Sequence, residues 1–65
     1  QLENRTLVTR ADRLYEQSLG DVRNYIAAHT ANFQAALESQ DSSTIRKART
    51  ALDEVLRQVE SESFL

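Results

Sequence analysis

His29 is the only histidine of this sequence, and histidine is the residue type best suited to proton transfer near neutral pH. It lies three residues after Ile26 and four before Phe33, so helical spacing places it on an apolar stripe. A catalytic histidine needs a nucleophile or an orienting carboxylate, and the spacing around His29 supplies neither. We interpret His29 as a histidine at the boundary of a core, with a pH-sensing role as the alternative.

Paired carboxylates are the second pattern that could do chemistry, as a general acid and a general base. The closest pairs in the sequence are Asp12 with Glu16 and Asp53 with Glu54. Adjacent helical residues point in different directions, and acid–base catalysis also needs a pocket, which a small helical chain rarely encloses. These carboxylates are therefore interpreted as a solvated face.

Basic side chains gather once, in the run IRKAR, where Arg46, Lys47 and Arg49 fall within about one helical turn. A phosphate-binding patch is conceivable, but a short basic run without interleaved aromatics is typical of a solvated surface. The chain has no Cys, no glycine-rich phosphate loop and no nucleophile elbow. We expect no enzymatic activity in this chain, and no cofactor or metal.

Size and composition restrict the class of protein. The chain has 65 residues, a net charge of −2 and a pI near 5.2, which permits one domain and argues against a nucleic-acid partner. No apolar run approaches the roughly 20 residues needed to cross a bilayer, and the start lacks the layout of a signal peptide. These features predict a cytoplasmic protein without a membrane partner.

Two breaks divide the chain into elements. Gly20 is the only glycine, and we expect it to close one helix, with Asp21 as the N-cap of the next. The polar run SQDSS, residues 39–43, is the second break, with Asp41 as the expected N-cap and Ser42 as the alternative.

Apolar residues at three- and four-residue spacing predict helices over about 2–19, 22–39 and 42–60. Because each helix must cover one apolar stripe and the links are short, we predict an all-α, antiparallel up-down-up three-helix bundle. The predicted core residues are Leu14, Ile26, Phe33, Leu37, Ile45, Leu52, Val55 and Leu56.

Polar and aromatic residues flank these stripes. Tyr15 and Tyr25 each carry a polar tip on an apolar body, and we place both at the bundle edge. On the third helix, Asp53 is expected to pair with Arg57 and with Arg49, each four residues away. Fraying is expected after about Val59, in the segment SESFL.

The order of these elements resembles the C-terminal helical lid of DnaK-type chaperones, the seventy-kilodalton heat-shock class. In that family a helix ends in a turn, here at Gly20. The next helix carries an apolar stripe that closes on small residues and a Leu, here AALES. A short acidic link follows, here QD, and then a last helix with an early Ile and a later Leu, here Ile45 and Leu52. The resemblance covers most of the chain and consists of spacings, not of an invariant signature.

The resemblance implies that residues 1–19 are the distal part of the long lid helix and that the other two helices complete the bundle at its tip. Whether residues 1–6 continue a longer helix stays open. The sequence stops soon after Val59, without the long extension and acidic terminal motif of cytosolic eukaryotic members. It therefore points to a bacterial member, similar to the paralogue HscC. No active-site residue is carried over, because the family binds ATP with Mg²⁺ and client peptide in other domains.

By this resemblance the chain is part of a larger chaperone for protein folding. Its lid closes over a bound unfolded client when ADP is bound and swings away when ATP is bound. Unfolded or misfolded clients and co-chaperones are then partners of the parent protein. The alternative is a freestanding three-helix module for protein interaction or self-association, with Tyr15, Tyr25 and Phe64 as anchors.

Overall fold

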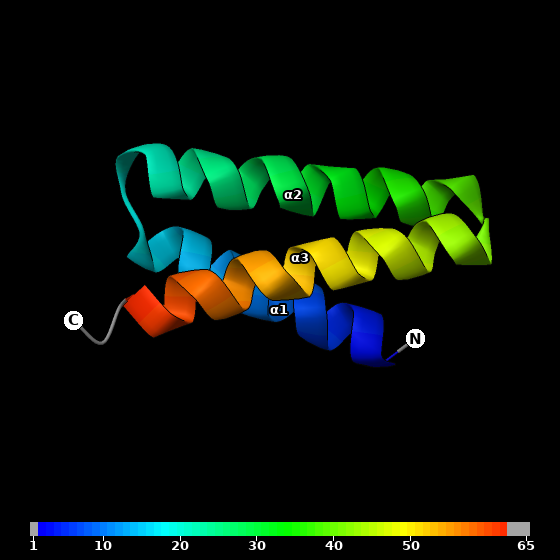
Figure 1. Cartoon of the computed structure of the whole chain (residues 1–65), viewed down its shortest axis with the longest axis horizontal. Helices are drawn as coiled ribbons and strands as arrows, with labels where there is room; N and C mark the ends of the chain where they lie inside the picture. The colour runs from blue at the N-terminus through cyan, green and yellow to red at the C-terminus, as the bar shows by residue number, and fades with distance from the viewer. Residues whose placement is uncertain (1, 63–65) are drawn as a thin grey trace.

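The computed structural model describes residues 2–62, which form three α-helices: α1 (Leu2–Gln17), α2 (Gly20–Ser39) and α3 (Ser42–Glu62). Figure 1 shows α1 and α3 running in one direction and α2, at the top of the view, running in the other. The predicted all-α, up-down-up three-helix bundle is confirmed, with no strand among the described residues. The helix ends differ from the predicted ones by at most two residues.

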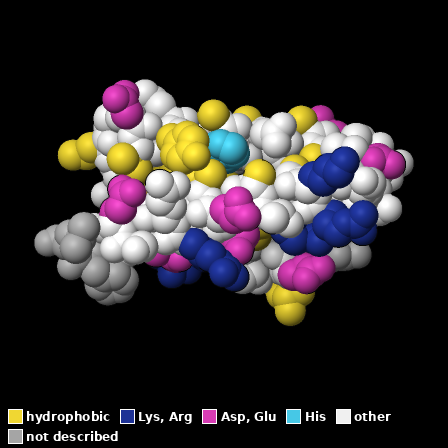
Figure 2. All heavy atoms as spheres, in the orientation of Figure 1, with side chains coloured by type: hydrophobic (Ala, Val, Ile, Leu, Met, Phe, Trp, Pro, Cys, Tyr) yellow, Lys and Arg dark blue, Asp and Glu magenta, His cyan; other side chains and the backbone are white. Residues whose placement is uncertain are grey.

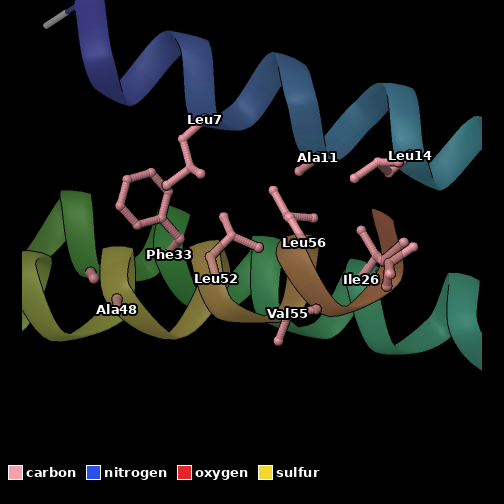
Figure 3. Close-up of a cluster of buried hydrophobic side chains, with 11 residues drawn as sticks. Leu7, Ala11, Leu14, Ile26, Phe33, Ala48, Leu52, Val55 and Leu56 are labelled. Atoms are coloured by element: carbon pink, nitrogen blue, oxygen red, sulfur yellow. The ribbon is translucent and has the colours of Figure 1, made fainter. Parts of the chain in front are cut away.

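Apolar side chains from all three helices meet along the bundle axis (Figure 3). The largest fully buried side chains come from α2 and α3, and α1 contributes Leu7, Ala11 and Leu14, which face them. Ala11 is completely buried, so its short side chain lets α1 approach the other two helices closely. The buried residues are Leu7, Ala11, Leu14, Ile26, Phe33, Ala36, Ala48, Leu52, Val55, Leu56 and Val59.

Leu37 and Ile45 were predicted in the core, but the structure buries them only partly, packed against its margin. The other predicted core residues are buried. Figure 1 gives the reason, because the turn between α2 and α3 projects beyond the first turn of α1. Two helices cover Leu37 and Ile45 there, where the prediction assumed three.

The α1–α2 turn differs from its prediction. Gly20 was expected just past the end of the first helix, yet α1 ends at Gln17 and Gly20 is the first residue of α2. Its φ of 58° is positive, a conformation that only glycine adopts at little cost. The N-cap is Leu19, in extended conformation and without a side-chain cap, so Asp21 is not the N-cap. Asp21 lies in the first turn, where its charge still complements the helix dipole.

The α2–α3 turn is built as the sequence predicts. Gln40 adopts a left-handed conformation and donates its amide to Leu37 O at 3.3 Å. Asp41 then caps α3, since its Oδ2 accepts from the Thr44 amide at 2.9 Å and from the Thr44 hydroxyl at 2.6 Å. The Ile45 amide donates to the carbonyl of Asp41 at 2.9 Å. The Thr44 hydroxyl and amide hold the pKa of Asp41 below its usual value.

Candidate functional site

Arg10 joins α1 to α3 through carboxylates near the second half of α3. Its Nε and Nη2 donate to the two carboxylate oxygens of Glu60 at 3.0 and 2.8 Å. Its Nη1 donates to Asp53 Oδ1 at 2.8 Å, and Asp53 Oδ2 accepts from Arg57 Nε at 2.8 Å. We call Arg10, Asp53, Arg57 and Glu60 the Arg10 cluster. Through this cluster, Arg10 of α1 contacts α3 at two positions along the helix, Asp53 and Glu60.

The electrostatics of the Arg10 cluster favour ion pairing over catalysis. The hydrogen bonds from Arg10 are the main cause that lowers the pKa of Asp53 and of Glu60, while partial burial opposes them. The hydrogen bonds that Arg10 donates to these carboxylates, Glu60 first, raise the pKa of Arg10. A carboxylate held ionised in this way is a poor general acid, and each Arg10 contact is already a charge-assisted hydrogen bond. The cluster therefore clamps two helices together.

Sequence reasoning missed this cluster, because it considered only charged pairs within one helix. A signal was present. Arg10 lies three residues after Leu7 and four before Leu14, so it borders the apolar stripe of α1. Charged residues in that position typically pair across a helix interface.

Arg49 provides a second link between α1 and α3. Its Nε and Nη2 donate to Asn4 Oδ1 at 3.2 and 2.9 Å, and Nη2 lies 3.8 Å from Glu3 Oε1. The predicted pairing of Arg49 with Asp53 is therefore wrong, whereas the Asp53–Arg57 pair is confirmed. The two arginine links border a hollow of about 310 Å³, which is lined by Glu3, Thr6, Leu7, Arg10, Arg49, Thr50 and Asp53.

His29 lies half-buried on α2, with its ring edge-on to that of Tyr25 at a centroid distance of 4.9 Å. Figure 2 shows the imidazole, in cyan, beside hydrophobic side chains on the outer side of α2. Among residues 2–62, the contact that the His29 ring makes is this edge-on packing against Tyr25.

The predicted interaction residues do not form one surface. Tyr15 lines the groove between α1 and α2 beside Ala27 and Ala31, and the guanidinium of Arg23 stacks on its ring at 4.4 Å. Tyr25 is 47% exposed and lies on a face of α2 that does not line this groove. Phe64 lies outside the described residues.

A different apolar surface lies at the α1–α2 turn. Leu19 is 81% exposed and Val22 is 39% exposed, and both line one hollow at this turn. Tyr25, which is 47% exposed, follows Val22 by three residues on α2. We call these three residues the corner surface. The sequence analysis did not identify Leu19 or Val22 as exposed residues. Their position near Gly20 was the signal in the sequence, because apolar side chains at a turn can lie too far from the neighbouring helices to be covered by them.

The side chains of the basic run, Arg46, Lys47 and Arg49, do not gather at one site. Arg46 and Lys47 are exposed, while Arg49 is half-buried and turned towards α1. Within residues 2–62, no group of three or more His, Cys, Asp or Glu side chains could hold a metal ion. Among the helices of the same residues, none combines the length and apolar character that a membrane span requires.

Comparison of the chain with models of protein families, with curated proteins and with solved structures found no match.

Proposed function

We propose that this chain is the tip of the helical lid of a DnaK-type chaperone, where it stabilises closure over a bound client peptide. The observation that carries the proposal is the position of the two turns. The chain reverses between α1 and α2 beside Gly20 and between α2 and α3 at Gln40 and Asp41. These are the breaks on which the family resemblance rests.

The links between α1 and α3 support a mechanical role. If α1 continues the long lid helix, movement of that helix is transmitted to the α2–α3 hairpin only when α1 does not slide along the other two helices. The Arg10 cluster and the Arg49–Asn4 contact oppose such slippage, because they tie α1 to α3 along the interface. The tip then moves with the lid and slows peptide release.

In this proposal the chain itself performs no chemistry. ATP and Mg²⁺ belong to the nucleotide-binding domain of the parent chaperone, and the peptide belongs to its β-sandwich. Clients and co-chaperones are partners of that parent, in the cytoplasm of a bacterial cell. The support for these features is the family resemblance alone.

Release of a labelled peptide from the ADP-bound parent chaperone tests the proposal. Leu52→Asp places a carboxylate in the core of the bundle, since Leu52 is fully buried, and we expect it to speed peptide dissociation. Glu54→Ala is the matched control on the exposed side of α3 and should leave the rate unchanged. Equal release rates for the two variants would contradict a role of the tip in closure.

A freestanding protein-interaction module is the second candidate, and the exposed corner surface favours it. The natural reading frame distinguishes the two functions. A frame that encodes a nucleotide-binding domain and a β-rich domain upstream of this chain supports the lid. A frame without them supports the module.

A further inference from the structure

The corner surface lies next to a hollow formed by α2 and the end of α3. The hollow measures about 190 Å³ and is lined by Ser18, Leu19, Val22, Val59 and Glu62. Val59 is 8% exposed and forms its floor, so a side chain that enters the hollow would contact core residues. Together with Tyr25, this gives an apolar anchor site at this end of the bundle.

Acidic side chains border this anchor site on two sides. Asp21 precedes Val22 directly and lies four residues before Tyr25, so it is on the same side of α2 as the tyrosine. Glu62 closes the hollow from α3. Figure 2 shows acidic side chains on both sides of the hydrophobic group at this end of the bundle. The nearest cation in sequence, Arg23, is turned onto Tyr15 and donates to its carbonyl at 3.1 Å.

A second, separate hollow between α2 and α3 is lined by Asn32, Ala35, Ala36, Ser39, Thr44, Lys47 and Ala48, so it carries a basic side chain and does not extend the acidic border. The apolar anchor site with its acidic border favours a partner helix that carries basic side chains beside apolar ones.

We propose that the corner surface binds an amphipathic helix of a partner protein, with apolar anchors on one face and Lys or Arg beside them. The anchors contact Leu19, Val22 and Tyr25, and the basic residues pair with Asp21 and Glu62. A second copy of the chain is disfavoured as the occupant, because it would bring the same acidic residues against each other. Anionic membrane surfaces are disfavoured for the same reason. The inference goes beyond the proposed function and does not depend on it.

Fluorescence anisotropy with the whole chain and synthetic helical peptides tests this inference. The probe is a labelled peptide with Leu at three- and four-residue spacing and Lys and Arg beside that stripe. Two matched peptides carry Glu in place of the basic residues, or a central Pro that breaks the helix. We expect binding of the basic helical peptide only, weakening as salt rises from about 0.01 to about 1 M.

Variants of the chain locate the binding. Leu19→Ser with Val22→Ser removes the apolar anchors and should weaken binding about tenfold or more. Asp21→Lys with Glu62→Lys should weaken it and reverse the preference between the basic and the acidic peptide. Leu2→Ser and Glu38→Lys are the matched controls, since both residues are exposed and lie outside this surface. Melting temperatures of all variants establish that they fold.

Ring signals of His29 give a second, local readout. The chain has a single histidine, and its ring lies against Tyr25, so its proton resonances should shift when the peptide binds. Three results would overturn the proposal. They are equal binding of the Pro-containing peptide, unchanged binding to the Leu19/Val22 variant, and concentration-dependent self-association that the same variant abolishes.

Discussion

At the scale of single residues, Arg10 uses its planar guanidinium to reach two carboxylates of α3 at once. Its side chain is 26% exposed, so solvent screens these pairs only in part. We expect Arg10→Ala to lower the free energy of unfolding by about 1–2 kcal/mol, the range for partly screened charge-assisted hydrogen bonds. Urea unfolding followed by circular dichroism measures the loss.

Two control substitutions test this explanation of Arg10. Arg10→Lys keeps the charge but cannot donate to Glu60 with two groups in one plane, so it should recover only part of the stability. Arg5→Ala removes an exposed arginine of the same helix and should change stability by less than about 0.5 kcal/mol. Full stability in Arg10→Ala would mean that the cluster contributes nothing to the bundle.

The same residues predict how stability depends on pH. In the folded chain Arg10 lowers the pKa values of Asp53 and Glu60 below their ordinary 3.8 and 4.5. Their contribution is therefore complete above the ordinary values and is lost as the pH falls through the lowered ones. We expect the free energy of unfolding to decrease from about pH 5 towards about pH 2. Denaturation curves at several pH values measure this slope.

Arg10→Ala is the informative variant for the pH experiment. It removes the group that lowers both pKa values, so the slope below about pH 5 should become shallower. A smaller slope should remain, because Asp41 also has a lowered pKa and its partner Thr44 is untouched. An identical slope in the two proteins would show that other carboxylates govern acid unfolding.

At the scale of secondary structure elements, the two turns differ in how they begin the next helix. Asp41 accepts two hydrogen bonds from Thr44, whereas the N-cap of α2 is Leu19, without a side-chain bond. We expect Asp41→Ala to destabilise the chain by about 0.5–2 kcal/mol. Thermal unfolding followed by circular dichroism measures the change.

Asp21→Ala is the matched comparison for that variant, because it removes an acid from the first turn of α2 but no cap. It should cost only the dipole interaction, about 0.3–1 kcal/mol at low salt, and less at high salt. If Asp21→Ala proved as harmful as Asp41→Ala at high salt, the assignment of the caps would be incorrect.

The positions of the turns could be predicted from the sequence, but the structure of the first could not. Glycine adopts a positive φ at little cost, and Gly20 has one. Spacing alone does not say whether such a residue ends one helix or begins the next, and here it begins α2. For Asp41, the cap and its partner Thr44 are close in sequence, so local rules were sufficient.

At the scale of the whole molecule, stability depends on a small core. Phe33 is fully buried between the three helices (Figure 3), and Phe33→Ala should cost about 3–5 kcal/mol. Small domains have roughly 5 kcal/mol or less in total, so we expect this variant to be largely unfolded at 37 °C. Circular dichroism should show lost helicity, while Tyr25→Ala, on an exposed face, should melt close to the unchanged protein.

Helical periodicity was sufficient to predict the bundle, because each stripe had to be covered by the other two. It could not predict which parts of a stripe remain uncovered. Leu37, Ile45 and Val22 lie near helix ends, and the relative lengths and offsets of the helices decide their burial. The pairing of Arg10 with Glu60 depends on the same offset, since it joins residues far apart in the sequence. Local rules favoured the nearer Arg49–Asp53 pair.

An odd number of antiparallel helices places the start of α1 and the end of α3 at opposite ends of the bundle (Figure 1). The long dimension of the molecule is 37 Å. Tension applied through these two ends would run along the helix axes and pull α1 and α3 in a sliding direction. The contacts of Arg10 and of Arg49 between α1 and α3 would then bear the load at the same time, not one after another. A bundle with this arrangement is suited to holding two attached segments apart. It is poorly suited to insertion into a loop of another domain, where both ends must lie close together.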